Sequence, residues 1–141
     1  MAIENPEVEV AGFPSQMPWF EALECRAAVP ASPAVYAITT RDQFARLASN
    51  SCVLYIGKTA QLGGAGDNSR LYAYRYQPLR YHGGRIRSLA ERVAATGHHL
   101  ILKWKELHTE QDAIDAESAL LSAFYEHAIE LPPFNRKLGA A

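Results

Sequence analysis

The sequence predicts a single α/β domain, and three observations support this fold class. First, 141 residues suffice to bury one hydrophobic core without a metal or disulfides. Second, a composition of 48% hydrophobic and 21% charged residues is typical of a globular protein. Third, short apolar runs rich in β-branched residues alternate along the chain with longer stretches of helical periodicity. Together these features favour strands and helices packed into one unit.

The elements follow from the pattern of apolar residues and from the residues that interrupt it. Short β-rich runs predict strands at residues 35–39, 52–56 and 100–105. Helical spacing, with capping residues before it or a glycine or prolines after it, predicts helices at residues 41–48, 67–76, 85–95 and 109–129. Residues 1–33 contain five prolines and predict an irregular N-terminal extension with one helical turn near residues 20–25. We therefore expect the domain at residues 34–137 and a short tail at 138–141.

Several classes of protein are excluded or disfavoured. A phosphate-binding P-loop ending at Gly57-Lys58-Thr59 needs a glycine at position 52, which is Cys52. The two cysteines, Cys25 and Cys52, do not form a disulfide framework or a zinc-binding pattern. The sequence has neither a secretory leader pattern nor an apolar run long enough to cross a membrane. We expect a cytoplasmic protein without a membrane partner.

The net charge of −1 conceals a segregation of charge along the chain. Residues 57–105 contain nine Lys or Arg residues and only two acidic residues, whereas acidic residues predominate in the remainder. Four tyrosines lie among these arginines: Tyr72, Tyr74, Tyr76 and Tyr81. Positive charge that neutralises phosphates, together with rings that stack on bases, indicates a nucleic-acid surface. A merely solvated set of charged helix faces is the alternative.

One carboxylate lies on the apolar side of the last predicted helix. Glu117 falls in the middle of the stripe formed by Ala113, Ile114, Leu120, Leu121, Phe124 and Ala128. Burying an unpaired carboxylate costs several kcal/mol, so such a group normally has a cation, a metal or a proton as partner. Glu117 is therefore either salt-bridged to an arginine of the basic segment or part of a metal or catalytic site.

The order of these motifs resembles the GIY-YIG nuclease family. The matching residues are Ala34-Val35-Tyr36, Tyr55-Ile56-Gly57, Lys58, Arg70 with Tyr74, Glu117 and Pro133-Phe134-Asn135-Arg136-Lys137. The resemblance covers residues 34–137. Two features depart from the family pattern, since Ala34 replaces the first glycine and the segment from Lys58 to Arg70 is longer than usual. The resemblance implies a small three-stranded antiparallel sheet flanked by helices.

The resemblance also implies an activity, metal-dependent hydrolysis of phosphodiester bonds in DNA by an endonuclease. Glu117 would hold one Mg²⁺ or Mn²⁺ ion, and Arg70 would bind the scissile phosphate. Tyr36 is the first candidate for orienting or deprotonating water, Tyr55 the second, and Tyr74 a proton relay. A free phenol has a pKa near 10, so a tyrosine base requires a neighbour that stabilises phenolate. Ordinary packing in strands is the alternative for each strand tyrosine.

Supporting roles fall to residues around these five. Lys58 lies near both strand ends, where its charge would lower the pKa of a tyrosine. Asn135 would brace the site or hydrogen-bond a tyrosine hydroxyl. The residues expected to contact nucleic acid are Lys58, Arg70, Arg75, Arg80, Arg85 and Arg87. The five histidines show no metal-ligand spacing, and His82 is of interest because it lies within the basic segment.

Other functions remain open from the sequence. A nucleic-acid-binding module on the same scaffold would bind DNA without cutting it, and a small-molecule phosphodiesterase would cut a different substrate. Since no second targeting domain is evident, specificity would come from the domain itself, a homodimer or a targeting partner.

Overall fold

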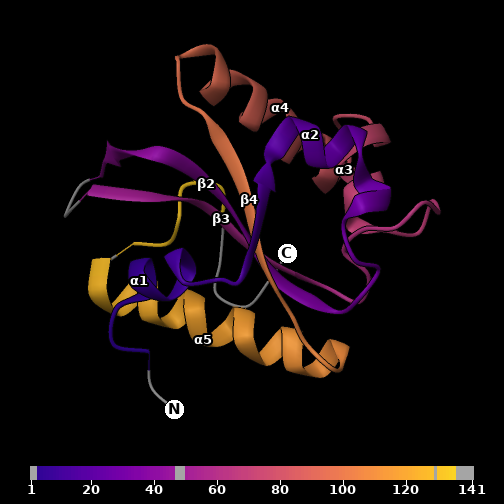
Figure 1. Ribbon diagram of the computed structural model, residues 1–141. Helices are drawn as coiled ribbons and strands as arrows, with labels where there is room; N and C mark the ends of the chain where they lie inside the picture. The colour runs from indigo at the N-terminus through magenta and orange to yellow at the C-terminus, as the bar shows by residue number, and fades with distance from the viewer. Residues whose placement is uncertain (1–2, 47–49, 129, 136–141) are drawn as a thin grey trace.

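The computed structural model describes residues 3–46, 50–128 and 130–135 (Figure 1). Its helices and strands, in chain order, are α1 (Pro6–Ala11), β1 (Ser15–Pro18), α2 (Trp19–Glu24), the 3₁₀ helix η1 (Arg26–Ala28), β2 (Ala34–Ala45), β3 (Asn50–Thr59), α3 (Arg70–Tyr76), α4 (His82–Ala95), β4 (Leu100–Glu106) and α5 (Glu110–Ala128). This arrangement confirms the α/β class. Among the described residues, no helix combines the length and the hydropathy needed to cross a lipid bilayer.

The sheet has four antiparallel strands in the order β1-β4-β2-β3, not the three that were predicted. The additional strand is β1, which pairs with β4 from Ser15 opposite Trp104 to Pro18 opposite Ile101. It is only four residues long and ends in a proline, so its sequence carries almost no strand signal. Proline is tolerated there because β1 is an edge strand.

The irregular N-terminal extension predicted for residues 1–33 is wrong for most of its described part. Pro6 begins α1, and the side chain of Asn5 caps this helix by accepting from the backbone N–H of Glu7 at 3.1 Å. Proline fits the first turn of a helix because its missing N–H has no partner there in any case. Trp19, at the start of α2, is fully buried in the core. This segment is therefore packed into the fold.

The predicted helix at residues 41–48 is also wrong. Strand β2 continues to Ala45, and its last residues pair with β3 as Phe44 opposite Ser51 and Ala45 opposite Asn50. Phe44 packs against the core from this strand, and two register shifts precede it in the ladder with β3. Tertiary pairing thus overrides a short helical pattern. Leu47 and Ala48 lie outside the described residues.

The remaining predicted helices are confirmed with small changes at their ends. Ser69 caps α3 by accepting from the backbone N–H of Tyr72 at 3.0 Å. Helix α4 begins at His82, three residues earlier than predicted, and Gly97 follows it with a φ of +96°. Thr109 caps α5 through the backbone N–H of Asp112 at 3.1 Å. Local capping chemistry was therefore a sound guide to these helices.

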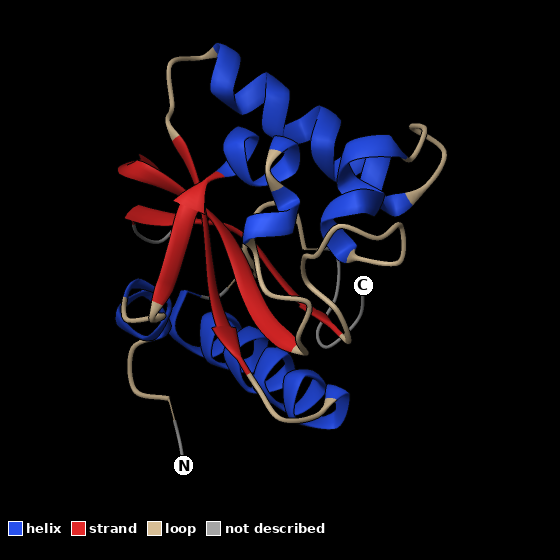
Figure 2. Cartoon of the chain, turned by 45° about the vertical axis from the view of Figure 1, so that its right-hand side comes forward, coloured by secondary structure: helices blue, strands red, loops and turns tan. Residues whose placement is uncertain are grey.

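The sheet separates two hydrophobic clusters. Helices lie on both faces of the sheet (Figure 2). Helices α2, α3 and α4 cover one face, where Tyr36, Trp19 and Tyr74 share a core. Helices α5 and α1 cover the other face, where Val35 packs with residues of α5. Adjacent strand residues such as Val35 and Tyr36 thus serve opposite faces, as strand geometry requires.

Candidate active site

The site is built around a close approach of Tyr36 to the backbone of β3. Tyr36 pairs with Gly57 across the β2–β3 ladder. A Cβ on Gly57 would lie 2.5 Å from both Cζ and Oη of Tyr36 and 2.8 Å from Cε2 of Tyr55. Those distances are far inside van der Waals contact. Glycine is therefore needed at position 57 because the Tyr36 phenol occupies the space of a side chain.

Three phenols lie together at this point. The hydroxyls of Tyr36 and Tyr74 are 2.5 Å apart, and both side chains are buried. The ring of Tyr55 is 6.2 Å from that of Tyr36, centroid to centroid. Burial raises the pKa of all three hydroxyls, with the charge of Arg70 acting in the opposite direction. The phenols therefore stay protonated near neutral pH.

Tyr55 contacts His82, which was not among the predicted site residues. Its Oη lies 3.0 Å from Nε2 of His82, at the start of α4, and the hydroxyl donates when the imidazole carries its proton on Nδ1. The position of His82 inside the basic segment was the only sequence signal. Its partner Tyr55 is far away in the chain, so a pairing could not be predicted. Imidazole groups ordinarily titrate near pH 6.5, closer to neutral than a phenol does.

Glu117 is buried, as the helical periodicity predicted. Its side chain is 1% exposed in the middle of α5. Neither carboxylate oxygen makes a hydrogen bond, and no ion pair to Glu117 is formed within the described residues. Burial raises the pKa of this carboxyl group, while the charges of Lys58 and Arg70 lower it. The predicted salt-bridge alternative is therefore not formed, although two cations act on the group through space.

Arg70 interacts electrostatically with the three tyrosines and with Glu117. It begins α3, and its backbone N–H donates to the carbonyl of Gln61 at 2.9 Å. Its guanidinium pKa is raised above the ordinary value chiefly by electrostatic interaction with Tyr36, with Tyr74, Tyr55 and Glu117 also contributing. The Nε atom is buried without a hydrogen bond. Three of the seven such buried polar atoms among the described residues thus belong to Arg70 and Glu117.

Lys58 acts electrostatically on Glu117 and lies one position along the strand from Gly57. It pairs with Val35, one position along the ladder from Tyr36, so it extends from the opposite face of the sheet. Arg70 is the cation that acts on the tyrosines, and Lys58 acts on Glu117. The expectation that Lys58 lowers a tyrosine pKa stays a prediction, and the structure adds an electrostatic effect of Lys58 on the carboxylate.

Asn135 braces the strand that contains Tyr55 and Gly57. Its Oδ1 accepts from the backbone N–H of Ile56, and its Nδ2 donates to the Ile56 carbonyl, both at 2.9 Å. Because β3 is an edge strand, these bonds satisfy backbone groups that have no neighbouring strand. Of the two predicted roles, the structure shows the brace.

The four expected nucleic-acid contacts other than Lys58 and Arg70 divide into two groups. Arg75, Arg80 and Arg85 are exposed, and none of them forms an ion pair among the described residues. Arg87 instead donates to the carbonyls of Tyr74 and Arg75, at 2.9 and 3.1 Å, where α3 ends. Arg87 therefore has a structural role that joins α4 to α3.

The donor set suits a single hard cation better than a cage of protein ligands. Within the described part of the chain, no group of three or more His, Cys, Asp or Glu residues is placed to hold a metal ion. Glu117 nevertheless offers two buried oxygens without hydrogen bonds. Mg²⁺ is often held by one or two carboxylates, with water and phosphate oxygens completing its shell. Glu117 therefore fits this kind of site.

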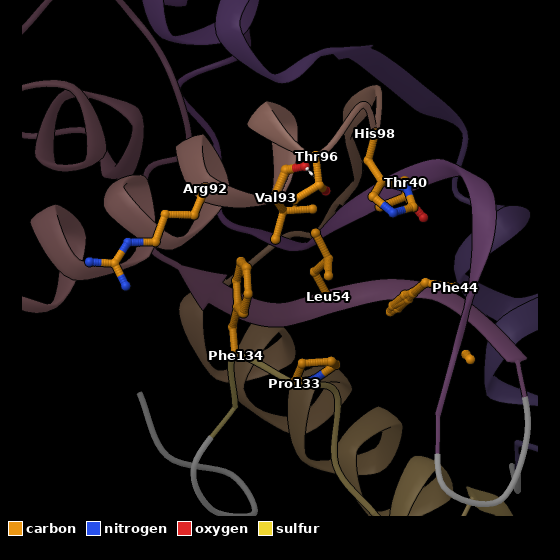
Figure 3. A pocket seen from close by; sticks show the side chains of 10 residues that line it. Thr40, Phe44, Leu54, Arg92, Val93, Thr96, His98, Pro133 and Phe134 are labelled. Atoms are coloured by element: carbon orange, nitrogen blue, oxygen red, sulfur yellow. Dashed lines mark hydrogen bonds between the residues drawn. The ribbon is translucent and has the colours of Figure 1, made fainter.

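A separate apolar hollow of about 370 Å³ lies at the other end of β3. Figure 3 shows Leu54, Val93 and Phe134 around it, from β3, α4 and the segment after α5. The backbone N–H of Phe134 donates to the Leu54 carbonyl at 2.8 Å. None of the predicted site residues lines this hollow, so it is distinct from the candidate active site.

Comparison of the chain with models of protein families, with curated proteins and with solved structures finds no match in any of the three. The resemblance to GIY-YIG nucleases stays a prediction from the sequence motifs. Support for a function therefore comes from the residues and their geometry.

Proposed function

We propose that the protein is a metal-dependent DNA endonuclease that hydrolyses phosphodiester bonds by a GIY-YIG type of mechanism. One observation carries the proposal: Glu117 is buried with two oxygens that make no hydrogen bond, while Lys58 and Arg70 act on it electrostatically. A buried carboxylate without a bonded partner is costly for stability. Such a cost is expected where a carboxylate serves a cation or a substrate, because functional sites retain strain that packing alone would remove.

Glu117 would hold the metal ion, most simply Mg²⁺, through one or both of its oxygens. When bound, the ion would supply Lewis acidity that offsets negative charge on the phosphate and the leaving oxygen. The nearby positive charge of Lys58 keeps the carboxyl group more acidic than burial alone would allow. Glu117 is thereby kept closer to the ionised form that a cation needs.

Arg70 would bind the scissile phosphate. Its planar guanidinium presents several donors in one plane, which matches phosphate oxygens. The buried Nε has no acceptor among the described residues, so the fork is not committed to another protein group at that atom. We expect this contact to strengthen as charge develops on the phosphate in the transition state.

The tyrosines would orient the attacking water and move its proton. Because burial raises the pKa of their hydroxyls, they act as neutral phenols that accept one proton while donating another. Tyr36 stays the first candidate to contact the water, supported by its bond to Tyr74. His82, bonded to Tyr55, is the group in this cluster best suited to accept a proton near neutral pH.

A second candidate function is a nucleic-acid-binding module that does not cut. Its support is the complete burial of Tyr36 and Tyr74, whose hydroxyls bond each other. In that case the tyrosine cluster is core packing and the exposed arginines bind DNA. The buried carboxylate then has no explanation, which makes this the weaker proposal.

A plasmid-nicking assay separates the two functions. Supercoiled DNA is incubated with the protein in Mg²⁺ and in EDTA, and binding is measured in parallel at increasing salt. The endonuclease proposal expects nicked product in Mg²⁺ alone. Salt-sensitive binding without product in either condition supports the binding module instead.

A further inference from the structure

Exposed aromatic and apolar side chains gather where α3 turns into α4. Tyr76 is 54% exposed, Leu79 60% and Tyr81 48%, and they are three of seven large exposed hydrophobic residues among those described. Together with Arg75 and Arg80 they form what we call the α3–α4 surface. Single exposed apolar residues are ordinary on proteins, but such a concentration marks an interaction site.

The rings of this surface are flanked by guanidinium groups. Arg80 lies over the ring of Tyr81 at 4.9 Å, and Arg75 over the ring of Tyr76 at 5.5 Å. Arg26, from η1, lies on Tyr76 as well, also at 5.5 Å from its centroid. Cation–π contacts of this kind hold an aromatic ring in place beside a positive charge. The surface therefore presents flat rings and cations side by side.

The charge of the surface suits a polyanion. Residues 68–90 include five arginines and no aspartate or glutamate. Arg75, Arg80 and Arg85 are exposed and form no ion pair among the described residues. Their positive charge is thus not compensated locally, which favours binding to phosphates.

The turn that carries the surface is held firmly. The backbone N–H of Tyr81 donates to the Pro78 carbonyl, and that of Gly83 to Oε1 of Gln77, both at 3.0 Å. A Cβ on Gly84 would lie 2.1 Å from the Pro78 carbonyl oxygen, so glycine allows the turn to pack against the start of α4. Because its backbone is fixed, the surface loses little entropy on binding.

The surface adjoins the candidate active site through the chain itself. Tyr76 follows Tyr74 by two residues on α3, so one ring faces outward while the other is buried in the site. Tyr81 directly precedes His82, which bonds Tyr55. A nucleic-acid strand bound to the α3–α4 surface would therefore run close to the tyrosines of the candidate active site.

We propose that the α3–α4 surface binds a single-stranded segment of DNA, with bases stacking on Tyr76 and Tyr81. An intact duplex exposes phosphates to the arginines but keeps the faces of its bases inside the stack. Unpaired bases expose those faces and can stack on aromatic rings or guanidinium planes. The inference rests on the proposed function and makes it more specific: the preferred substrate contains unpaired bases, as in a flap or a single strand beside a duplex.

Fluorescence anisotropy in EDTA tests the surface without any cleavage. The probes are a labelled single-stranded oligonucleotide, its blunt duplex and the duplex with a single-stranded flap. The parent protein is expected to bind the single strand and the flap at least about fivefold more tightly than the blunt duplex. Tyr76→Ala and Tyr81→Ala should each weaken binding of the single strand by about 5- to 100-fold and leave duplex binding within about twofold.

Two further variants separate stacking from unfolding and from general aromatic binding. Tyr76→Leu keeps apolar bulk but removes the ring, so its loss of single-strand binding with unchanged thermal melting identifies stacking. Tyr125→Ala is the matched control, since Tyr125 is 55% exposed on α5, and it should bind every probe as the parent does.

The proposal is overturned if the parent prefers the blunt duplex, or if the tyrosine variants lose single-strand and duplex binding equally. If binding depends on the tyrosines but the protein does not nick plasmid DNA, the single-strand binding surface is supported and the nuclease proposal is rejected. If the protein nicks plasmid DNA but its binding does not depend on the tyrosines, the nuclease proposal is supported and the single-strand binding surface is rejected.

Discussion

Gly57→Ala tests the geometry of the site with the addition of one methyl group. The new Cβ would lie 2.5 Å from Cζ and Oη of Tyr36, whereas carbon atoms in contact are about 3.5–4.0 Å apart. The phenol must therefore move by about 1 Å, which disturbs its 2.5 Å hydrogen bond to Tyr74. Overpacking of this size costs about 1–3 kcal/mol, or roughly 2–10 °C in melting temperature. A displacement of about 1 Å at reacting groups lowers a rate by about 100-fold.

The assay combines thermal melting with single-turnover plasmid nicking. Gly66→Ala is the matched control, because a Cβ at Gly66 would have no heavy atom within 4 Å. We expect this control to melt and nick as the parent does. If Gly57→Ala also melts at the parent temperature and nicks at the parent rate, Tyr36 does not occupy the space above Gly57 and the description of the site fails.

Three other changes follow from the same structure. Asn135→Ala removes both hydrogen bonds to Ile56 and should lower the free energy of unfolding by about 2–4 kcal/mol. The control Asn50→Ala changes an exposed residue and should lower it by almost nothing. Chemical denaturation measures both. His82→Gln should lower the single-turnover rate by about 10²–10⁴ and remove one limb of the pH–rate profile. An unchanged profile excludes His82 as proton acceptor. Burial raises the folded-state pKa of Glu117. The parent should therefore lose stability as the pH rises from about 4.3 through that raised pKa, whereas Glu117→Gln should not show this loss. Parallel plots of melting temperature against pH for the two proteins would contradict this.

The sequence predicted the parts of the fold that local chemistry decides. Ser69 and Thr109 mark the starts of their helices because hydroxyls cap free backbone N–H groups. Glu117 was predicted to be buried because helical periodicity assigns it to an apolar stripe. These properties depend on neighbours within about four residues, which the sequence displays directly.

The rest depends on contacts between distant segments. Strand β1 exists because Ser15–Pro18 pairs with β4, and residues up to Ala45 are extended because they pair with β3. Likewise, the bond of His82 to Tyr55 and the brace of Asn135 on Ile56 arise from tertiary packing. Single-residue patterns carry no record of such partners, so these features required the structure.

The proposed endonuclease activity depends most directly on Glu117 as the metal-binding carboxylate. The measurement is single-turnover cleavage of supercoiled DNA by the parent and by Glu117→Gln, in Mg²⁺ and in EDTA, with DNA binding and melting measured on the same samples. We expect the parent to cut only with Mg²⁺, and Glu117→Gln to fold and bind DNA but to cut at least about 100-fold more slowly. Cleavage at the parent rate by Glu117→Gln, or cleavage by the parent that persists in EDTA, would contradict the account.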